Sequence, residues 1–123
     1  VKAVPPDLAS SETKQVFSDI WSTEDGIGWR IEADSLGFAS RTHFSLVATL
    51  RGCYLSNGSV GTQAAVSNDL FHAPDCAHFA PVPDTPTLQP RHASALTYFD
   101  GSLVILGGPP AGDAGTTAWQ YFP

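Results

Sequence analysis

The densest group of metal-ligating residue types lies within one short segment. His72, Asp75, Cys76 and His78 fall within seven residues, and each of these side chains can bind zinc or copper. A closed zinc site needs about four ligands in a tetrahedral array, and the segment lacks the paired Cys or paired His spacing that builds one. The sequence therefore predicts no metal site here and favours a solvated turn with one oxidised cysteine.

Three tyrosines and four histidines are the other residues that could do chemistry, around a redox metal. Tyr54 and Tyr98 fall in segments predicted to be strands, where packing is the ordinary use of an aromatic side chain, and Tyr121 belongs to no site motif. The sequence has no nucleophilic Ser or Cys elbow and no phosphate-cradling glycine loop. It therefore predicts no catalytic residue and no cofactor.

Composition and charge exclude several classes of function. Of the 123 residues 21 are Gly or Pro, which is typical of one modest, turn-rich all-β domain. The net charge of −6 makes nucleic-acid binding unfavourable, because such a surface repels phosphate backbones. No apolar stretch approaches the roughly 20 residues that cross a bilayer, so no membrane span is predicted. The absence of methionine predicts a segment of a longer protein.

Two stretches of the chain, residues 18 to 58 and 68 to 108, are copies of one pattern offset by fifty residues. Apolar bulk matches between them, as in Trp21 and Phe71, which we therefore expect in equivalent surroundings. A third copy begins at Ala118. Six positions are identical: Asp19/Asp69, Asp25/Asp75, Asp34/Asp84, Arg41/Arg91, Leu46/Leu96 and Gly58/Gly108. The equivalent arginines are predicted to serve the fold by tying a loop or a neighbouring sheet.

Alternation and turn residues predict the strands. Apolar residues alternate with Ser and Thr from Phe44 to Leu50, whereas the run from Leu103 to Leu106 is continuously apolar and suits a strand covered on both faces. Asp100-Gly101 predicts a tight hairpin between two strands, and Arg51-Gly52 occupies nearly the same place one repeat earlier.

The order of an arginine, an alternating strand, a hairpin and an apolar strand ending in glycine resembles the Kelch repeat, most closely in RHASALTYFDGSLVILGG, residues 91 to 108. The resemblance implies a segment of a β-propeller made of four-stranded antiparallel blades. Residues 41–82 would form one full blade, and residues 18–32 and 91–122 would form partial blades. Residues 1–17 would be a lead-in segment.

The same resemblance implies two antiparallel neighbouring strands, with Cys53 at the start of one and Cys76 just beyond the end of the other, and so implies a disulfide; two buried free thiols are the alternative. Asn57-Gly58-Ser59 is an N-glycosylation acceptor, so a glycan is predicted on Asn57. Together these features favour a secreted or cell-surface protein.

Residues 22 to 29 resemble the Asp-box turn of sialidase-like propellers. The resemblance puts Glu24 at the motif's aspartate position, followed by Asp25, and gives Gly26 a positive φ and Trp29 the role of fixing the return strand. The predicted role is structural, and an exposed acidic loop that binds a ligand or cation is the alternative.

The predicted function is a non-catalytic structural module, or one that binds protein partners or glycans, completed by further blades of the same or identical chains. Loops 58–66 and 109–117 are its predicted contact surfaces. The alternative is a fragment of a secreted carbohydrate-active oxidase or sialidase-like hydrolase whose catalytic residues lie outside this segment.

Overall fold

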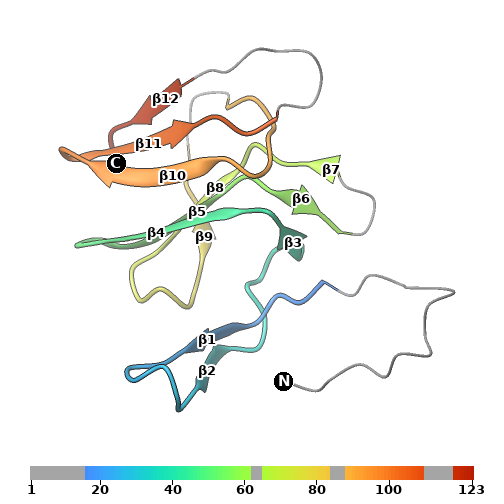
Figure 1. The fold of residues 1–123 in the computed structure, drawn as a ribbon, viewed down its shortest axis with the longest axis vertical. Helices are drawn as coiled ribbons and strands as arrows, with labels where there is room; N and C mark the ends of the chain where they lie inside the picture. The colour runs from blue at the N-terminus through green and yellow to red at the C-terminus, as the bar shows by residue number, and fades with distance from the viewer. Residues whose placement is uncertain (1–15, 62–64, 84–87, 110–117) are drawn as a thin grey trace, which may run out of the picture.

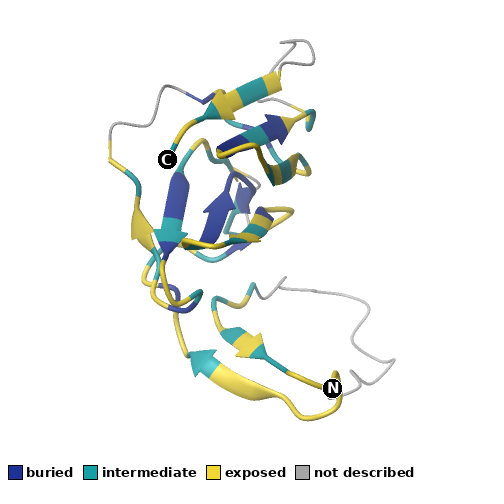
Figure 2. Ribbon diagram, turned by 90° about the vertical axis from the view of Figure 1, so that its left-hand side faces the viewer, coloured by how far each residue is buried: buried dark blue, intermediate teal, exposed yellow. Residues whose placement is uncertain are grey.

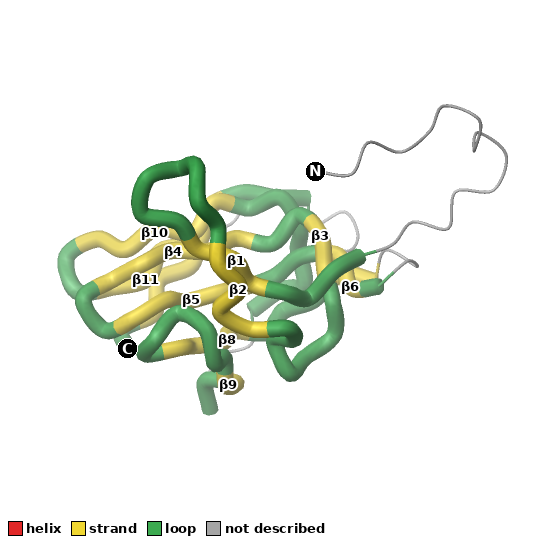
Figure 3. The backbone as a smooth tube through the Cα atoms, turned by 90° about the horizontal axis from the view of Figure 1, so that it is seen from below, coloured by secondary structure: helices red, strands yellow, loops and turns green. Residues whose placement is uncertain are grey.

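The computed structural model describes residues 16–61, 65–83, 88–109 and 118–123. Within these ranges the chain forms twelve short strands. The described backbone is drawn as strand and loop throughout (Figure 3), which confirms the all-β prediction. The described residues accordingly contain no helix that could span a membrane. Most of the predicted lead-in segment lies outside the described residues.

The centre of the molecule is a four-stranded antiparallel sheet whose strands follow one another in chain order (Figure 1). Each strand pairs antiparallel with its neighbours; short connections join the first strand to the second and the third to the fourth, whereas residues 57–69 separate the second from the third. The strands are β4 (Ser45–Thr49), β5 (Gly52–Ser56), β8 (Leu70–Ala73) and β9 (Ala80–Pro81).

A three-stranded sheet repeats the first part of this arrangement. It consists of β10 (Ala95–Phe99), β11 (Ser102–Leu106) and β12 (Ala118–Tyr121). The bounds of β10 and β11 are those of β4 and β5 moved by fifty residues. Leu55 pairs with Phe71, but its equivalent Ile105 pairs with Trp119, so the second copy is two residues shorter between these strands. The fifty-residue step predicted for the third copy is therefore wrong by two residues.

Two smaller sheets complete the described fold. One is the hairpin of β1 (Ile20–Ser22) and β2 (Arg30–Ala33). The other joins β3 (Arg41–Thr42), β6 (Ser59–Val60) and β7 (Ala65–Val66). The segment 58–66, predicted as a contact loop, thus contains two strand segments. Of the second predicted contact loop, residues 110–117 lie outside the described residues.

The hydrophobic core lies between the four-stranded and three-stranded sheets, where β10 lies close to β4 (Figure 1). Strand alternation puts Val47 and Tyr54 on the face that meets Leu96 and Tyr98. Leu103 on β11 is buried and belongs to the same core cluster. The second sheet therefore packs face to face on the first.

The β1–β2 hairpin differs from the sheets in burial, because exposed and intermediate residues make up its strands (Figure 2). Trp21 on β1 is 51% exposed, and its Nε1 donates a hydrogen bond to Asp19. Phe71 is only 8% exposed and stacks on Phe38 at 4.1 Å between ring centroids. The prediction of equivalent surroundings for Trp21 and Phe71 is therefore wrong. In the described residues β1 pairs only with β2, whereas β8 has a partner on both edges.

Candidate functional site

Arg41 is the most heavily bonded side chain in the first copy. Its Nη1 donates to Asp69 Oδ1 at 2.5 Å and to the carbonyl of Asn57 at 3.0 Å, and its Nη2 donates to Asp69 Oδ2 at 3.0 Å. The guanidinium also lies 4.7 Å from the ring centroid of Phe38 and 5.2 Å from that of Phe71. The side chain is almost completely buried, so these groups replace water as its partners.

Arg91 makes the same backbone contacts fifty residues later. Its Nη1 donates to the carbonyl of Gly107 at 3.0 Å, as Arg41 does to Asn57. Its Nε donates to the carbonyl two residues before it at 3.3 Å, as in Arg41 at 3.4 Å. Both arginines therefore tie the end of a central strand to the segment that precedes the sheet, as their equivalence predicts.

The loops that follow the two arginines also join the copies to each other. The Gly58 amide donates to the carbonyl of Arg91 at 3.0 Å, and the Ala93 amide donates to the carbonyl of His43 at 2.8 Å. A Cβ on Gly58 would lie 2.8 Å from the Thr42 carbonyl oxygen, and one on Gly108 would lie 2.6 Å from that of His92. These close approaches explain why both copies have glycine at this position.

Asn57, the predicted glycan acceptor, is completely buried between the two copies. Its Nδ2 donates to Ser94 Oγ at 3.1 Å, and its Oδ1 has no hydrogen-bond partner among the described residues. A glycan is attached to Nδ2, so it would replace the bond to Ser94 and would have no path to solvent. The folded structure therefore disfavours a glycan on Asn57.

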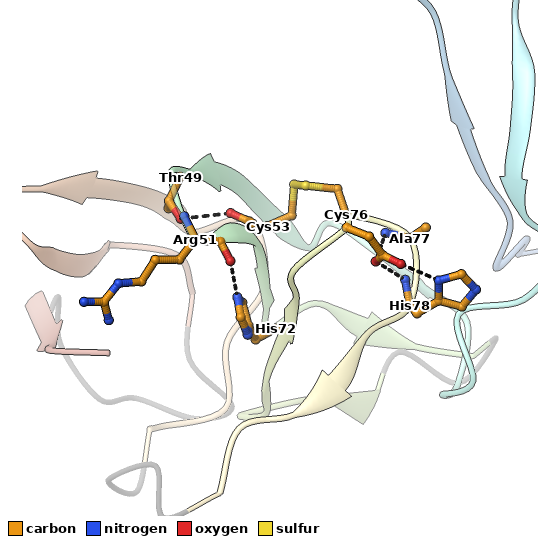
Figure 4. Close-up of a disulfide and its surroundings, with 9 residues drawn as sticks. Thr49, Arg51, Cys53, His72, Cys76, Ala77 and His78 are labelled. Carbon is orange, nitrogen blue, oxygen red and sulfur yellow. Dashed lines mark hydrogen bonds and ion pairs between the residues drawn. A yellow bond between two sulfur atoms is a disulfide. The ribbon is translucent and has the colours of Figure 1, made fainter.

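A disulfide joins Cys53 at the start of β5 to Cys76 in the turn after β8 (Figure 4). The two Cα atoms lie 4.8 Å apart, and Cys53 is buried. The pairing agrees with the arrangement that the resemblance implied, in which the two strands are antiparallel neighbours. No cysteine is free.

The turn after β1 is organised by Asp25. Its Oδ1 accepts hydrogen bonds from the Ile27 amide at 2.8 Å and the Gly28 amide at 2.9 Å, and Gly26 has φ +75°. These amides, with the hydroxyl of Thr23, lower the pKa of Asp25. Asp25 thus accepts the turn amides and Gly26 supplies the positive φ, which are the structural roles predicted for them.

Glu24 and Trp29, the other two residues assigned to this turn, do not take part as predicted. Glu24 is exposed and lies 3.8 Å from the Arg30 guanidinium, and no turn amide is bonded to it. Trp29 is 59% exposed and so does not fix the return strand by burial. The acidic position of the turn is Asp25, one residue later than the resemblance placed it.

The equivalent turn in the second copy keeps this geometry without a glycine. Asp75 Oδ1 accepts the amides of Ala77 at 3.0 Å and His78 at 2.9 Å, and Cys76 takes φ +59° where Gly26 stood. The His78 amide and imidazole hold the pKa of Asp75 far below its ordinary value, and the imidazole lies 2.6 Å from Oδ2.

The side chains that could have ligated a metal each have a different partner and do not converge. His78 bonds Asp75, whereas His72 lies beside Tyr54 and its Nε2 lies 2.8 Å from the carbonyl of Arg51 (Figure 4). Cys76 is bonded to Cys53 in the disulfide. Across the described ranges no three His, Cys, Asp or Glu side chains gather as a metal site.

The three tyrosines do gather, although the sequence did not predict it. Tyr54 is buried in the core cluster, and Tyr98 and Tyr121 pack against that cluster from β10 and β12. Burial raises the pKa of Tyr54. This is a packing arrangement across two sheets, in accord with the predicted use of Tyr54 and Tyr98.

Sequence reasoning missed two residues of the arginine site. Asp69 was identified as one of six identities, but its pairing with Arg41 spans 28 positions and left no local signal. Phe38 lies under the guanidinium in an irregular segment with no periodic pattern. The repeat did not reveal the pair either, because the residue 28 positions after Arg91 is Trp119, so the spacing from Arg41 to Asp69 occurs only once.

Comparison with protein-family models and with curated proteins found no match to this chain. The site is thus defined by its own geometry. The hydrogen bonds of Arg41 go to a carboxylate and to backbone carbonyls within the fold, and those of the Asp25 and Asp75 carboxylates go to turn groups. Such bonds hold strands and turns in place. The Arg41 guanidinium and the Asp25 and Asp75 carboxylates therefore have structural partners within the fold.

Proposed function

We propose that this chain is a segment of a Kelch-type β-propeller and acts as a non-catalytic structural or interaction module of a secreted or cell-surface protein. In this proposal the four-stranded sheet is one blade, spanning residues 41–82. The β1–β2 hairpin (18–32) and the β10–β12 sheet (91–122) are parts of its two neighbours.

The observation that carries the proposal is the repeated arginine contact. Arg41 and Arg91 each bond the carbonyl sixteen residues ahead and the carbonyl two residues behind. Face-to-face packing of the two sheets adds support, because radial stacking of such sheets is how a propeller buries its blades. Fold alone does not define activity, so the non-catalytic assignment depends on how the site residues are used.

The disulfide supports the proposed extracellular setting, since stable disulfides belong to oxidising compartments. We expect no free thiol in the protein recovered from a secretory host under non-reducing conditions. We also expect Asn57 to carry no glycan, so glycosidase treatment should leave the mass of the peptide that contains it unchanged. A glycan on Asn57 in the folded protein would contradict the structure described for the arginine loops.

The alternative function, a fragment of a carbohydrate-active oxidase or sialidase-like hydrolase, has one observation in its favour, the gathering of three tyrosines. Catalytic assays test this alternative. Copper-loaded protein would be assayed for hydrogen peroxide release from carbohydrate alcohols, and separately for sialic acid release. The proposal predicts no activity, and predicts that Tyr54→Phe and Tyr121→Phe change stability alone. Activity that either substitution abolishes in a folded protein would favour the enzyme.

A further inference from the structure

Asn57 is followed by Gly58, and glycine is the neighbour that makes an asparagine most prone to lose its side-chain amide. The Gly58 nitrogen attacks Asn57 Cγ, and the new C–N bond closes a succinimide ring. Nδ2 leaves as ammonia and takes up the proton of the Gly58 amide. Water then opens the ring at either carbonyl, which gives aspartate or isoaspartate. Glycine favours the attack because it has no side chain to hinder it.

In the fold the second copy holds both reacting groups. The Gly58 amide donates to the carbonyl of Arg91 at 3.0 Å, and Asn57 Nδ2 donates to Ser94 Oγ at 3.1 Å. Asn57 is completely buried and Gly58 is buried beside it, so the water that would open the ring has no access. The packed junction therefore withholds the nucleophile, the leaving group and the water together.

Neither product of the reaction fits the packed junction. An aspartate at position 57 would bury a carboxylate at a place where the described residues offer Oδ1 no hydrogen-bond donor. An isoaspartate would lengthen the backbone immediately before Gly58, where even a Cβ would lie 2.8 Å from the Thr42 carbonyl oxygen. It would also displace the Asn57 carbonyl, which accepts from Arg41 Nη1 at 3.0 Å. Both products therefore oppose repacking of the two copies.

The second copy reaches the same loop geometry without this reactive amide. Gly107 stands where Asn57 is in the first copy, and both residues have φ 62°. We propose that Asn57 is a deamidation site that the packed junction protects, and that the reaction, once it has occurred, keeps the two copies from repacking. The inference goes beyond the proposed function, since it depends only on the junction between the two copies.

Deamidation kinetics test the protection. Folded protein and protein in urea would be incubated at mildly alkaline pH, and mass spectrometry would quantify aspartate and isoaspartate at position 57. Asn57 should react at least about tenfold more slowly in the folded protein, because the reaction follows the population of the open junction. Asn68 is the internal control, since it is exposed in the fold and its rate should change much less. Equal rates for Asn57 in the two states would overturn the inference.

Leu103→Ala tests whether opening of the junction limits the reaction. Leu103 belongs to the core cluster between the two sheets, so its truncation loosens the junction without altering the Asn57-Gly58 pair. Deamidation of Asn57 should become at least about tenfold faster under folding conditions. Leu50→Ala is the matched control, since Leu50 is fully exposed on the turn after β4 and should leave the rate unchanged. An unchanged rate in Leu103→Ala would contradict the inference.

Asn57→Asp tests the effect of the product directly and does not depend on whether Leu103→Ala folds. Its matched control is Asn57→Gly, which copies the loop of the second copy and removes the reactive amide. The urea midpoint of Asn57→Asp should lie below that of Asn57→Gly, because only the aspartate buries a charge. An equal or higher midpoint for Asn57→Asp would show that the product is accommodated and would overturn the second half of the inference.

Discussion

The two arginine loops, residues 41–44 and 91–94, reach the same backbone geometry with different neighbours. His43 and Ala93 share a positive φ, at 55° and 52°, and Asn57 and Gly107 both have φ 62°. What is conserved between the loops is the arginine and its bonds to backbone carbonyls. The repeat is therefore held by contacts to the backbone, which tolerate wide change in the other side chains.

The largest expected effect comes from breaking the Arg41 site. Arg41→Ala should lower the free energy of unfolding by about 3–5 kcal/mol, because it leaves Asp69 and the Asn57 carbonyl without their buried partner. Urea unfolding followed by tryptophan fluorescence measures this loss. Arg30→Ala is the control, since Arg30 is largely exposed and should cost less than about 1 kcal/mol. A loss below 1 kcal/mol for Arg41→Ala would mean that the arginine does not hold the loop.

The disulfide distinguishes the copies, because Cys53 is replaced by Leu103 in the second. Cys53→Ala with Cys76→Ala opens a loop of 23 residues and should lower stability by about 3 kcal/mol, mainly through the unfolded state. Urea unfolding of this variant and of the oxidised parent gives the difference. Reducing the parent protein should give a similar loss, and an unchanged midpoint after reduction would refute the role given to the disulfide.

Gly58 tests whether the close approach of the backbone in the arginine loop requires glycine. Gly58→Ala should cost roughly 2–3 kcal/mol, because its Cβ meets the Thr42 carbonyl and its φ is +105°. Gly61→Ala is the matched control: its φ is +63°, but a Cβ there meets nothing within 4 Å, so about 1 kcal/mol is expected. Thermal unfolding ranks the two variants. Equal losses would mean that positive φ, and not the close approach, explains the conserved glycine.

The sequence predicted much of this fold, because its signals are local. Alternation in β4 and the Asp100-Gly101 turn indicate strands and hairpins directly, and the real turn in the first copy, Leu50-Arg51, is one residue from the predicted one. Contacts that depend on distant residues left no such signal. The burial of Asn57 depends on the second copy, where Ser94 bonds it. Trp21 is exposed on a strand that, in the described part of the chain, pairs with β2 alone.

The smallest expected effect concerns the two aspartate turns and acid. Both carboxylates have lowered pKa values in the fold, so their contribution to stability is present above the ordinary Asp value of about 3.9 and is lost as pH falls below it. The contribution of Asp75 should be the larger, because the His78 imidazole adds to the amide bonds. Urea midpoints at pH 7 and pH 3 should differ less in Asp75→Asn than in Asp25→Asn. The reverse order would contradict the assignment.

Cross-strand pairing in solution tests whether two copies of one sheet unit pack face to face. Nuclear Overhauser contacts between backbone protons should connect Leu55 with Phe71 and, in the second unit, Ile105 with Trp119. Side-chain contacts should also connect Tyr54 with Leu103 across the two sheets. Strand contacts that placed Trp119 away from Ile105, or no contact between Tyr54 and Leu103, would show that the two units do not pack in this way.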